Sequence, residues 1–184
     1  MGKMKVGVLL GSNRIGAFTK CVANCVVDFM PSNYEIHIIK IDHLPLYNQD
    51  YDADYPKEYI EFKKEIESMD ALLFITPEHN RSIPTLLKNA LDIGSRPVGK
   101  AVWSKKPAGI ISVSPGPIGA FGANHHLRQV LTVLNVPTMQ QPECYLGNIV
   151  NAIVDDTIAN EGTLAFLKKY VQAYTEWIDY MKKY

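Results

Sequence analysis

Short apolar runs alternate with amphipathic stretches along this chain, and this alternation limits the possible folds more than any other feature. Residues 5–10, 71–76 and 107–114 are continuous apolar runs typical of buried parallel strands, and residues 34–41 alternate as a further strand. Helical spacing of apolar residues marks the stretches 18–30, 57–69, 83–95, 122–135 and 163–184. Residues 136–147 resemble a broken fifth strand, and residues 42–55 a loop.

This βαβαβαβαβα order predicts an α/β fold, a parallel sheet with helices on both faces. Five strands fit the flavodoxin-like order 2-1-3-4-5, in one domain spanning residues 1–184. We place Pro84 in the first turn of its helix. A stripe in the last helix predicts core packing rather than a cofactor site: Leu164, Leu167, Val171, Tyr174, Ile178 and Met181.

Charge and cysteine content restrict the class of protein. Nineteen basic residues balance nineteen acidic ones, which argues against a nucleic-acid partner and leaves little repulsion to prevent self-association. No apolar run has the length of a membrane span, and none near the start has the pattern of a signal peptide. Cys21, Cys25 and Cys144 are interpreted as small buried hydrophobes, so we expect a cytoplasmic protein without a membrane partner.

Three polar, glycine-rich turns follow the first, third and fourth strands. They cover residues 11–19, 77–82 and 114–124. In a sheet of this order, ligands bind at the carboxyl ends of the strands, where the strand order reverses. The three turns are therefore the candidate binding site.

The first turn has the composition of a phosphate-binding loop. It places Ser12, Arg14, Gly16 and Thr19 ahead of a helix N-terminus, where backbone N–H groups, hydroxyls and a guanidinium can bind an anion. It matches neither the GxGxxG fingerprint nor a Walker A loop. The alternative is that Ser12 and Asn13 only cap the helix.

The second turn, within "TPEHNRSIPTLLKNALD", suits a flat heterocycle. Its backbone amides can donate to ring carbonyls, and Asn80 can bond a ring edge. Glu78 is either an acid–base group or, as we favour, a carboxylate that caps the following turn. His79 is either a general acid or, in the favoured interpretation, a solvated or stacked ring.

The third turn offers small residues and one hydroxyl. Ser114 is a possible donor, while Gly116 and Gly119 either admit a planar ligand closely or only satisfy the turn. His125 and His126 are adjacent on a helix and should point in different directions, which argues against a shared metal.

Three segments together resemble one family, the NADPH-dependent FMN reductases with a flavodoxin-like fold. "GSNRIGAFTK" resembles its phosphate loop, "TPEHNRSIPTLLKNALDIGSRP" resembles its T-P-E-Y-N-G-S-[IV]-P motif, and "SVSPGPIGAFGANHHLRQVL" is similar to its third segment. The similarity extends over residues 4–146. The family includes quinone, chromate and azo-dye reductases.

The resemblance implies a bound FMN, reduced by NADPH or NADH, that passes electrons to a small-molecule acceptor: a quinone, an azo compound, a metal ion or free flavin. No side chain need be catalytic, because the chemistry takes place at flavin N5. The family commonly forms homodimers or homotetramers. The implied FMN-binding residues are Ser12, Arg14, Gly16, Ala17, Phe18, Thr19, Pro77, Glu78, His79, Asn80, Arg81, Ser82, Ser114 and Gly116.

The chain departs from the family pattern at three of these positions. Ala17 replaces a serine and removes one phosphate-binding hydroxyl, and His79 replaces a tyrosine while keeping a flat ring. Arg81 replaces a glycine, at a cost of roughly 1 kcal/mol if the position has a positive φ. Its guanidinium either raises the flavin potential or points to solvent or a neighbouring subunit.

Two other classes of protein fit the same segments. A flavodoxin-like electron carrier reduced by a partner protein is the main alternative, although such carriers tend to be strongly acidic and this chain is neutral. A flavin-binding regulator is another. Arg81, Arg96, Lys105 and Lys106 are candidates for the 2′-phosphate of NADPH. The aromatic-rich stretches 45–60 and 170–184 are candidates for a subunit interface, with core burial the favoured role of their rings.

Overall fold

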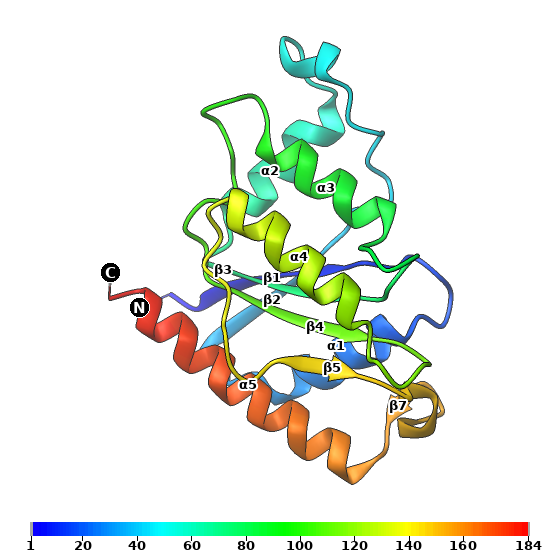
Figure 1. The fold of residues 1–184 in the computed structure, drawn as a ribbon. Coiled ribbons are helices and arrows are strands. Elements are labelled where there is room, and N and C mark those ends of the chain that lie inside the picture. The colour runs from blue at the N-terminus through cyan, green and yellow to red at the C-terminus, as the bar shows by residue number, and fades with distance from the viewer. Residues whose placement is uncertain (1, 184) are drawn as a thin grey trace.

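A parallel sheet organises the structure, a computed structural model that describes residues 2–183 (Figure 1). Its five strands lie in the order β2-β1-β3-β4-β5, as the sequence predicted. The strands are β1 (Met4–Leu10), β2 (Tyr34–Ile39), β3 (Ala71–Thr76), β4 (Ala108–Val113) and β5 (Cys144–Leu146). The order reverses at β1, which pairs with β2 on one side and with β3 on the other.

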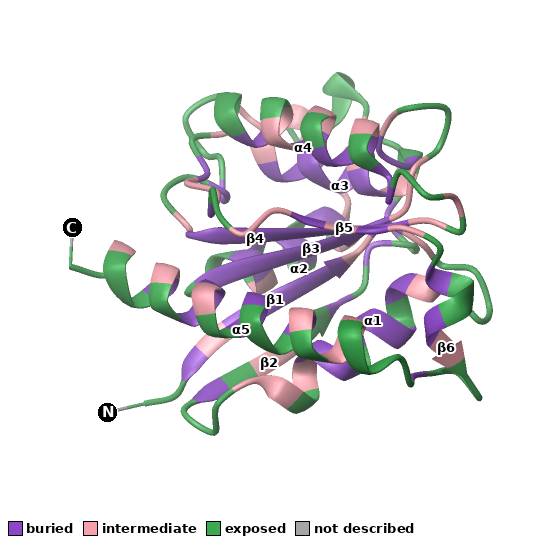
Figure 2. Cartoon of the chain, turned by 60° about the horizontal axis from the view of Figure 1, so that its bottom comes forward, coloured by how far each residue is buried: buried purple, intermediate pink, exposed green. Residues whose placement is uncertain are grey.

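Helices cover both faces of the sheet (Figure 2). They are α1 (Phe18–Phe29), α2 (Lys57–Glu67), α3 (Thr85–Ser95), α4 (Phe121–Val133) and α5 (Glu161–Met181). One hydrophobic cluster joins α1 and α5 to the sheet, and a second joins α2, α3 and α4 to the opposite face. Every residue of β3 and β4 is buried, because these central strands have helices on both sides.

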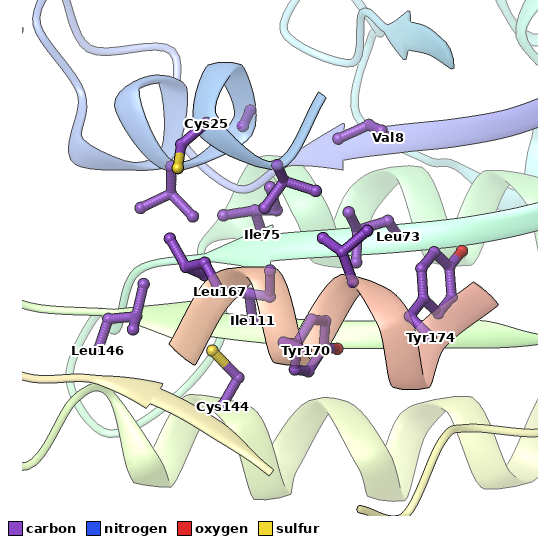
Figure 3. Packing of buried hydrophobic residues seen from close by; sticks show 14 of the residues in the cluster. Val8, Cys25, Leu73, Ile75, Ile111, Cys144, Leu146, Leu167, Tyr170 and Tyr174 are labelled. Atoms are coloured by element: carbon purple, nitrogen blue, oxygen red, sulfur yellow. The ribbon is translucent and has the colours of Figure 1, made fainter. Parts of the chain in front are cut away.

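The C-terminal helix packs its apolar stripe against the sheet (Figure 3). Leu167, Val171, Tyr174 and Ile178 are buried as predicted, whereas Leu164 and Met181 at the ends of the stripe are only partly covered. The sequence stripe omitted Tyr170, which is also buried. The hydroxyl of Tyr170 donates to the Ile110 carbonyl at 2.9 Å, and that of Tyr174 donates to the Leu72 carbonyl at 2.6 Å. These bonds satisfy the polar ends of two core rings.

Three details differ from the sequence prediction. Pro84 is the N-cap of α3 and not a residue of its first turn, so the helix begins at Thr85. The predicted loop 42–55 contains a 3₁₀ turn, η1 (Gln49–Asp52). The stretch before α5 holds a second 3₁₀ turn, η2 (Ile149–Ala152), and a hairpin of β6 (Ile153–Val154) and β7 (Thr157–Ile158). These elements are too short to show a hydrophobic period.

The fifth strand is broken, as predicted. β5 pairs with β4 only over Ile111–Val113, and an isolated bridge between Ala108 and Thr138 continues the edge. All three cysteines are buried free thiols. Within the described part of the chain, no helix combines the length and the apolar character needed to span a membrane.

We predict that Leu167→Ala destabilises the protein by roughly 2–5 kcal/mol, because it removes a fully buried side chain between α5 and the sheet. The measurement is a lower midpoint of urea unfolding with an unchanged slope. Val133→Ala is the matched control: Val133 is 82% exposed on α4, so its truncation should change the free energy of unfolding by less than about 0.5 kcal/mol. Equal effects of the two variants would contradict this account of the core.

Candidate functional site

The three predicted turns meet around one cleft at the carboxyl edge of the sheet. Its volume is about 540 Å³, within the roughly 300–1,000 Å³ of small-molecule sites. The lining residues are Gly11, Ser12, Asn13, Arg14, Ala17, Phe18, Thr19, Pro77, Glu78, His79, Leu86, Val113 and Pro115. The lining thus includes eight of the predicted residues, but not Gly16, Asn80, Arg81, Ser82, Ser114 or Gly116.

The ends of β1 and β3 touch at the floor of the cleft. The Gly11 N–H donates to the Ile75 carbonyl at 2.8 Å. A Cβ at Gly11 would lie 2.7 Å from Thr76 Oγ1 and 3.1 Å from Pro77 Cδ. Only glycine fits where the first turn leaves the sheet, so a larger residue would push the first and second turns apart.

The first turn folds around the side chain of Arg14. Its guanidinium donates to the Gly16 carbonyl at 2.7 Å and lies 5.2 Å from the centre of the Phe18 ring. Gly16 has φ +67°, a conformation that glycine adopts readily. Although Gly16 does not line the cleft, its turn and its carbonyl hold a positive charge at the rim.

The N-terminus of α1 opens into the cleft and has no side-chain cap. Its N-cap is Ala17, so the alternative role of Ser12 and Asn13 as helix caps is wrong. The Ser12 hydroxyl instead accepts the Arg14 N–H at 3.3 Å. Phe18 and Thr19 lie in the first turn, where backbone N–H groups have no acceptor within a helix.

Thr19 carries an unsatisfied hydroxyl at the same place. Thr19 is 1% exposed, and its Oγ1 has no hydrogen-bond partner among the described residues. A buried polar atom of this kind is costly unless a ligand or water satisfies it. Free amides, a hydroxyl and a nearby guanidinium together form a site for an anion such as phosphate.

The second turn is a tight two-residue loop. His79 and Ser82 exchange two backbone hydrogen bonds of 2.9 Å, and Asn80 and Arg81 between them have φ of 51° and 66°. Arg81 therefore does occupy a position with positive φ, where glycine is preferred. Neither Asn80 nor Arg81 lines the cleft, whereas His79 does.

Glu78 connects this turn to helix α4. Its Oε2 accepts the Ala123 N–H at 3.0 Å in the first turn of α4, and its Oε1 accepts from Arg81 Nη1 at 3.1 Å. The prediction that Glu78 caps the turn directly after it is wrong. Its carboxylate instead caps α4, the helix that follows β4. The Arg81 side chain is 72% exposed and paired with Glu78. Because this charge is compensated and solvated, the structure favours the exposed alternative for Arg81 over the tuning of a flavin.

The third turn contributes less to the cleft than its sequence indicated. The Ser114 hydroxyl donates to the Gly116 carbonyl at 2.9 Å, within its own loop, and Val113 and Pro115 line the cleft instead. Gly119 has φ +64°, and a Cβ there would lie 2.6 Å from the Tyr145 carbonyl carbon. Gly119 thus satisfies the turn, one of the two roles considered for it.

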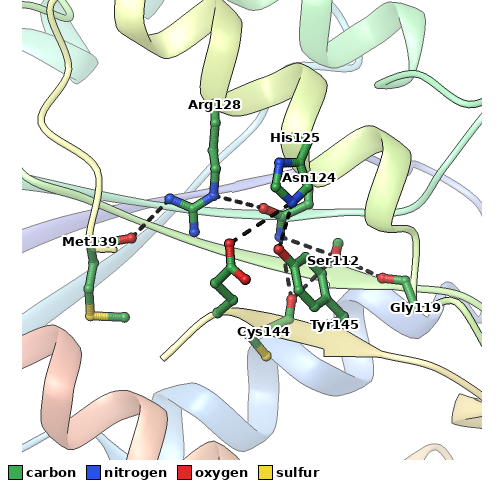
Figure 4. Close-up of polar contacts among 9 residues, drawn as sticks. Ser112, Gly119, Asn124, His125, Arg128, Met139, Cys144 and Tyr145 are labelled. Atoms are coloured by element: carbon green, nitrogen blue, oxygen red, sulfur yellow. Dashed lines mark hydrogen bonds and ion pairs between the residues drawn. The ribbon is translucent and has the colours of Figure 1, made fainter. Parts of the chain in front are cut away.

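A buried polar network beneath the third turn was missed by sequence reasoning (Figure 4). Asn124 Nδ2 donates to Ser112 Oγ at 3.2 Å, and Ser112 donates to the Gly119 carbonyl at 2.7 Å. Arg128 Nε donates to Asn124 Oδ1 at 3.1 Å, and its Nη1 donates to the Met139 carbonyl at 3.0 Å. The network fixes the loop after β4 to α4 and to the chain before β5. The signal for this network in the sequence is Asn124, an asparagine among the apolar positions of α4.

The two adjacent histidines diverge, as predicted. His126 Nδ1 lies 2.7 Å from Ser82 Oγ, whereas His125 Nε2 lies 2.9 Å from the Tyr145 hydroxyl. Burial, followed by a hydrogen bond to Glu143, raises the pKa of Tyr145 to about 12. Among residues 2–183, no group of three or more His, Cys, Asp or Glu side chains is placed to hold a metal ion.

Three of the four residues considered for the 2′-phosphate of NADPH lie away from the cleft. Lys105 and Lys106 precede β4 and so lie at the amino edge of the sheet, where Lys106 donates to the Met69 carbonyl at 2.5 Å. Arg96 is the C-cap of α3, at the end of the helix remote from the cleft. Only Arg81 lies at the carboxyl edge, and it is paired with Glu78.

The family model for NADPH-dependent FMN reductases matches residues 4–151, and the chain belongs to this family. A quinone reductase from Pseudomonas putida is 45% identical over 94% of both chains. A 2-hydroxy-1,4-benzoquinone reductase from a Burkholderia species is 41% identical over 95% of this chain and 96% of the relative. The solved structure of FerB, a flavoenzyme NAD(P)H:(acceptor) oxidoreductase from Paracoccus denitrificans, is 36% identical with a TM-score of 0.91, over 97% of this chain and 98% of that one.

The class of protein follows from this membership. The chain is an FMN-dependent oxidoreductase, with NAD(P)H as the electron donor. The residues around the cleft fit such a group: the anion site at α1 suits the phosphate, and the Pro77–His79 wall suits a flat ring.

We predict that Asn124→Ala costs roughly 2–3 kcal/mol of folding free energy, because it removes the buried amide that hydrogen-bonds to both Ser112 and Arg128. Urea unfolding of the FMN-free protein measures this loss. Gln129→Ala, at an exposed position on the same helix, should be nearly neutral. A neutral Asn124→Ala would mean that the network does not hold the third loop.

Proposed function

We propose that this protein is a quinone reductase that passes electrons from NAD(P)H, through FMN bound in the cleft, to small quinones. The observation that carries the proposal is the cleft itself, in which the free hydroxyl of Thr19 and the open N-terminus of α1 adjoin a wall of Pro77, Glu78 and His79. The quinone is taken from the names of two relatives at 45% and 41% identity.

In this proposal the FMN phosphate binds at the start of α1. Ser12, Arg14 and Thr19 supply side chains, and the first turn, with Ala17 and Phe18, supplies backbone N–H groups. Ala17 offers no hydroxyl, so the arginine and the amides hold the phosphate charge. Gly16 acts indirectly, through the turn that positions Arg14.

Pro77, Glu78 and His79 would hold the isoalloxazine ring. The remaining predicted residues shape the turns behind this wall: Asn80, Arg81, Ser82, Ser114 and Gly116. FMN bound there would supply the redox chemistry, which is hydride transfer from NAD(P)H and transfer of two electrons to the acceptor. Overall, NAD(P)H, a proton and a quinone yield NAD(P)⁺ and a hydroquinone.

The rest of the assignment belongs to the same proposal. Azo compounds, metal ions and free flavin are further acceptors, and the protein acts as a homodimer or homotetramer without a nucleic-acid or membrane partner. Three buried free thiols support a reducing, cytoplasmic location. The alternative of an electron carrier is disfavoured by the formal net charge of zero.

Anaerobic absorbance spectra test the proposed activity. We expect the purified protein to show flavin bands that bleach on addition of NAD(P)H and return when 1,4-benzoquinone is added. Azo dye and free FMN, in place of the quinone, measure the range of acceptors. Bands that neither nicotinamide bleaches would favour the electron carrier, and a protein that binds no FMN would overturn the assignment.

We predict that Thr19→Val weakens FMN binding by about 10- to 100-fold, the value of a hydrogen bond of 1.5–3 kcal/mol to a charged group. The FMN-free variant should be at least as stable as the wild type, because the lost hydroxyl has no partner there. Flavin titration and urea unfolding measure the two effects. Thr132→Val is the control. The Thr132 hydroxyl donates to the Arg128 carbonyl on the exposed side of α4, so its loss should not change FMN affinity. Equal affinities of Thr19→Val and wild type would place the phosphate elsewhere.

A further inference from the structure

A second hollow adjoins the cleft on the far side of the first turn. Its volume is about 280 Å³, and Ser12, Asn13 and Leu86 form a wall common to both spaces. The hollow therefore lies directly beside the cleft, with these residues between the two spaces. A space below the usual 300 Å³ or so suits one end of a ligand better than a whole one.

The hollow has an apolar floor and a basic rim. The floor consists of Leu10 at the end of β1, Ile38 and Ile39 at the end of β2, and Ile41 two residues beyond β2. Lys20, in the first turn of α1, and Lys40, directly after β2, form the rim. We call this space the lysine hollow.

Among the described residues, neither rim ammonium group has a counter-ion. Within residues 2–183, the side chains of Lys20 and Lys40 are exposed and form no ion pair or hydrogen bond. Lys57 and Lys88 differ in being ion-paired: Lys57 lies 3.3 Å from Glu61, and Lys88 lies 2.7 Å from Asp92. Two unpaired cations on a hollow beside a binding cleft suit an anionic ligand.

One carboxylate also lines the lysine hollow. Asp42 is exposed and has no side-chain hydrogen bond in the described part of the chain. A carboxylate accepts hydrogen bonds from ribose hydroxyls, as the acidic residue of dinucleotide-binding sites does. An apolar floor, one carboxylate and two ammonium groups match an adenine, a ribose and a phosphate on that ribose.

We propose that the lysine hollow binds the adenosine 2′-phosphate end of NADPH, with Lys20 and Lys40 pairing with the phosphate. This inference rests on the proposed function, and it makes the protein prefer NADPH to NADH. It also replaces the four residues considered from the sequence, since Lys105, Lys106 and Arg96 lie away from the cleft and Arg81 is paired.

The competing role of the same lysines is to neutralise the FMN phosphate. Lys20 follows Thr19 directly in α1, so its charge is close to the proposed phosphate site. The two roles differ in what a lysine variant loses. Loss of a donor site changes the choice between NADPH and NADH, whereas loss of a flavin contact lowers FMN content.

The first test is the ratio of kcat/KM for NADPH to that for NADH, in holoenzyme carrying Lys20→Ala, Lys40→Ala or both. We expect the double variant to lower this ratio by roughly tenfold or more, the value of a charge-assisted hydrogen bond, while FMN stays bound. Lys57→Ala removes an exposed charge on α2 and should leave the ratio unchanged. An unchanged ratio in the double variant would overturn the proposal, as would loss of FMN without a change in the ratio.

The second test does not depend on turnover. Titration calorimetry of the FMN-loaded protein should show tighter binding of 2′,5′-ADP than of 5′-AMP, and the double variant should lose this difference. Equal affinities of the wild type for the two nucleotides would refute the 2′-phosphate site. If the wild type binds 2′,5′-ADP more tightly yet neither nicotinamide bleaches the flavin, the proposed function fails and the lysine hollow remains.

Discussion

The pairing of β1 with β3 is the constraint on which the rest of the structure depends. The chain leaves β1 toward α1 on one face of the sheet, and leaves β3 toward α3 on the other face. Because the β1–α1 and β3–α3 connections leave the sheet on opposite faces, a crevice opens between them. Gly11 lets the two strand ends meet without a side chain between them, so the phosphate-binding turn and the flat wall of Pro77 and His79 face the same space.

Much of the fold follows from local sequence, because burial on both faces imposes a signal that few loops imitate. The six residues of β3 and of β4 are apolar or small along their whole length, and α5 repeats its buried residues with the helical period. Short elements carry no such period, which is why β6, β7 and the two 3₁₀ turns were not foreseen. Pro84 was placed inside α3 because proline suits both the N-cap and the first turn.

The sequence predicts which turns form the site, but it does not predict as well which side chains face the cleft. A polar turn after a buried strand lies at a known edge of the sheet, so the three turns were found from the sequence. The direction of each side chain depends on distant partners that no local pattern reveals. Glu78 is held by Ala123 in α4, Ser114 bonds within its own loop, and Lys20 belongs to the hollow only because β2 ends beside α1.

The two interactions of Glu78, with Ala123 and with Arg81, also determine how charge is distributed along the cleft. Its carboxylate faces the positive end of the α4 dipole and the Arg81 guanidinium, so the wall on this side carries almost no net charge. The opposite end has Arg14 and the N-terminus of α1, and Glu78, the carboxylate in the cleft lining, is already paired at its own end. The cleft is therefore electrically polar along its length. An elongated molecule with one anionic end lowers its energy in only one of its two possible directions, so the cleft sets the orientation of such a molecule before any specific hydrogen bond forms.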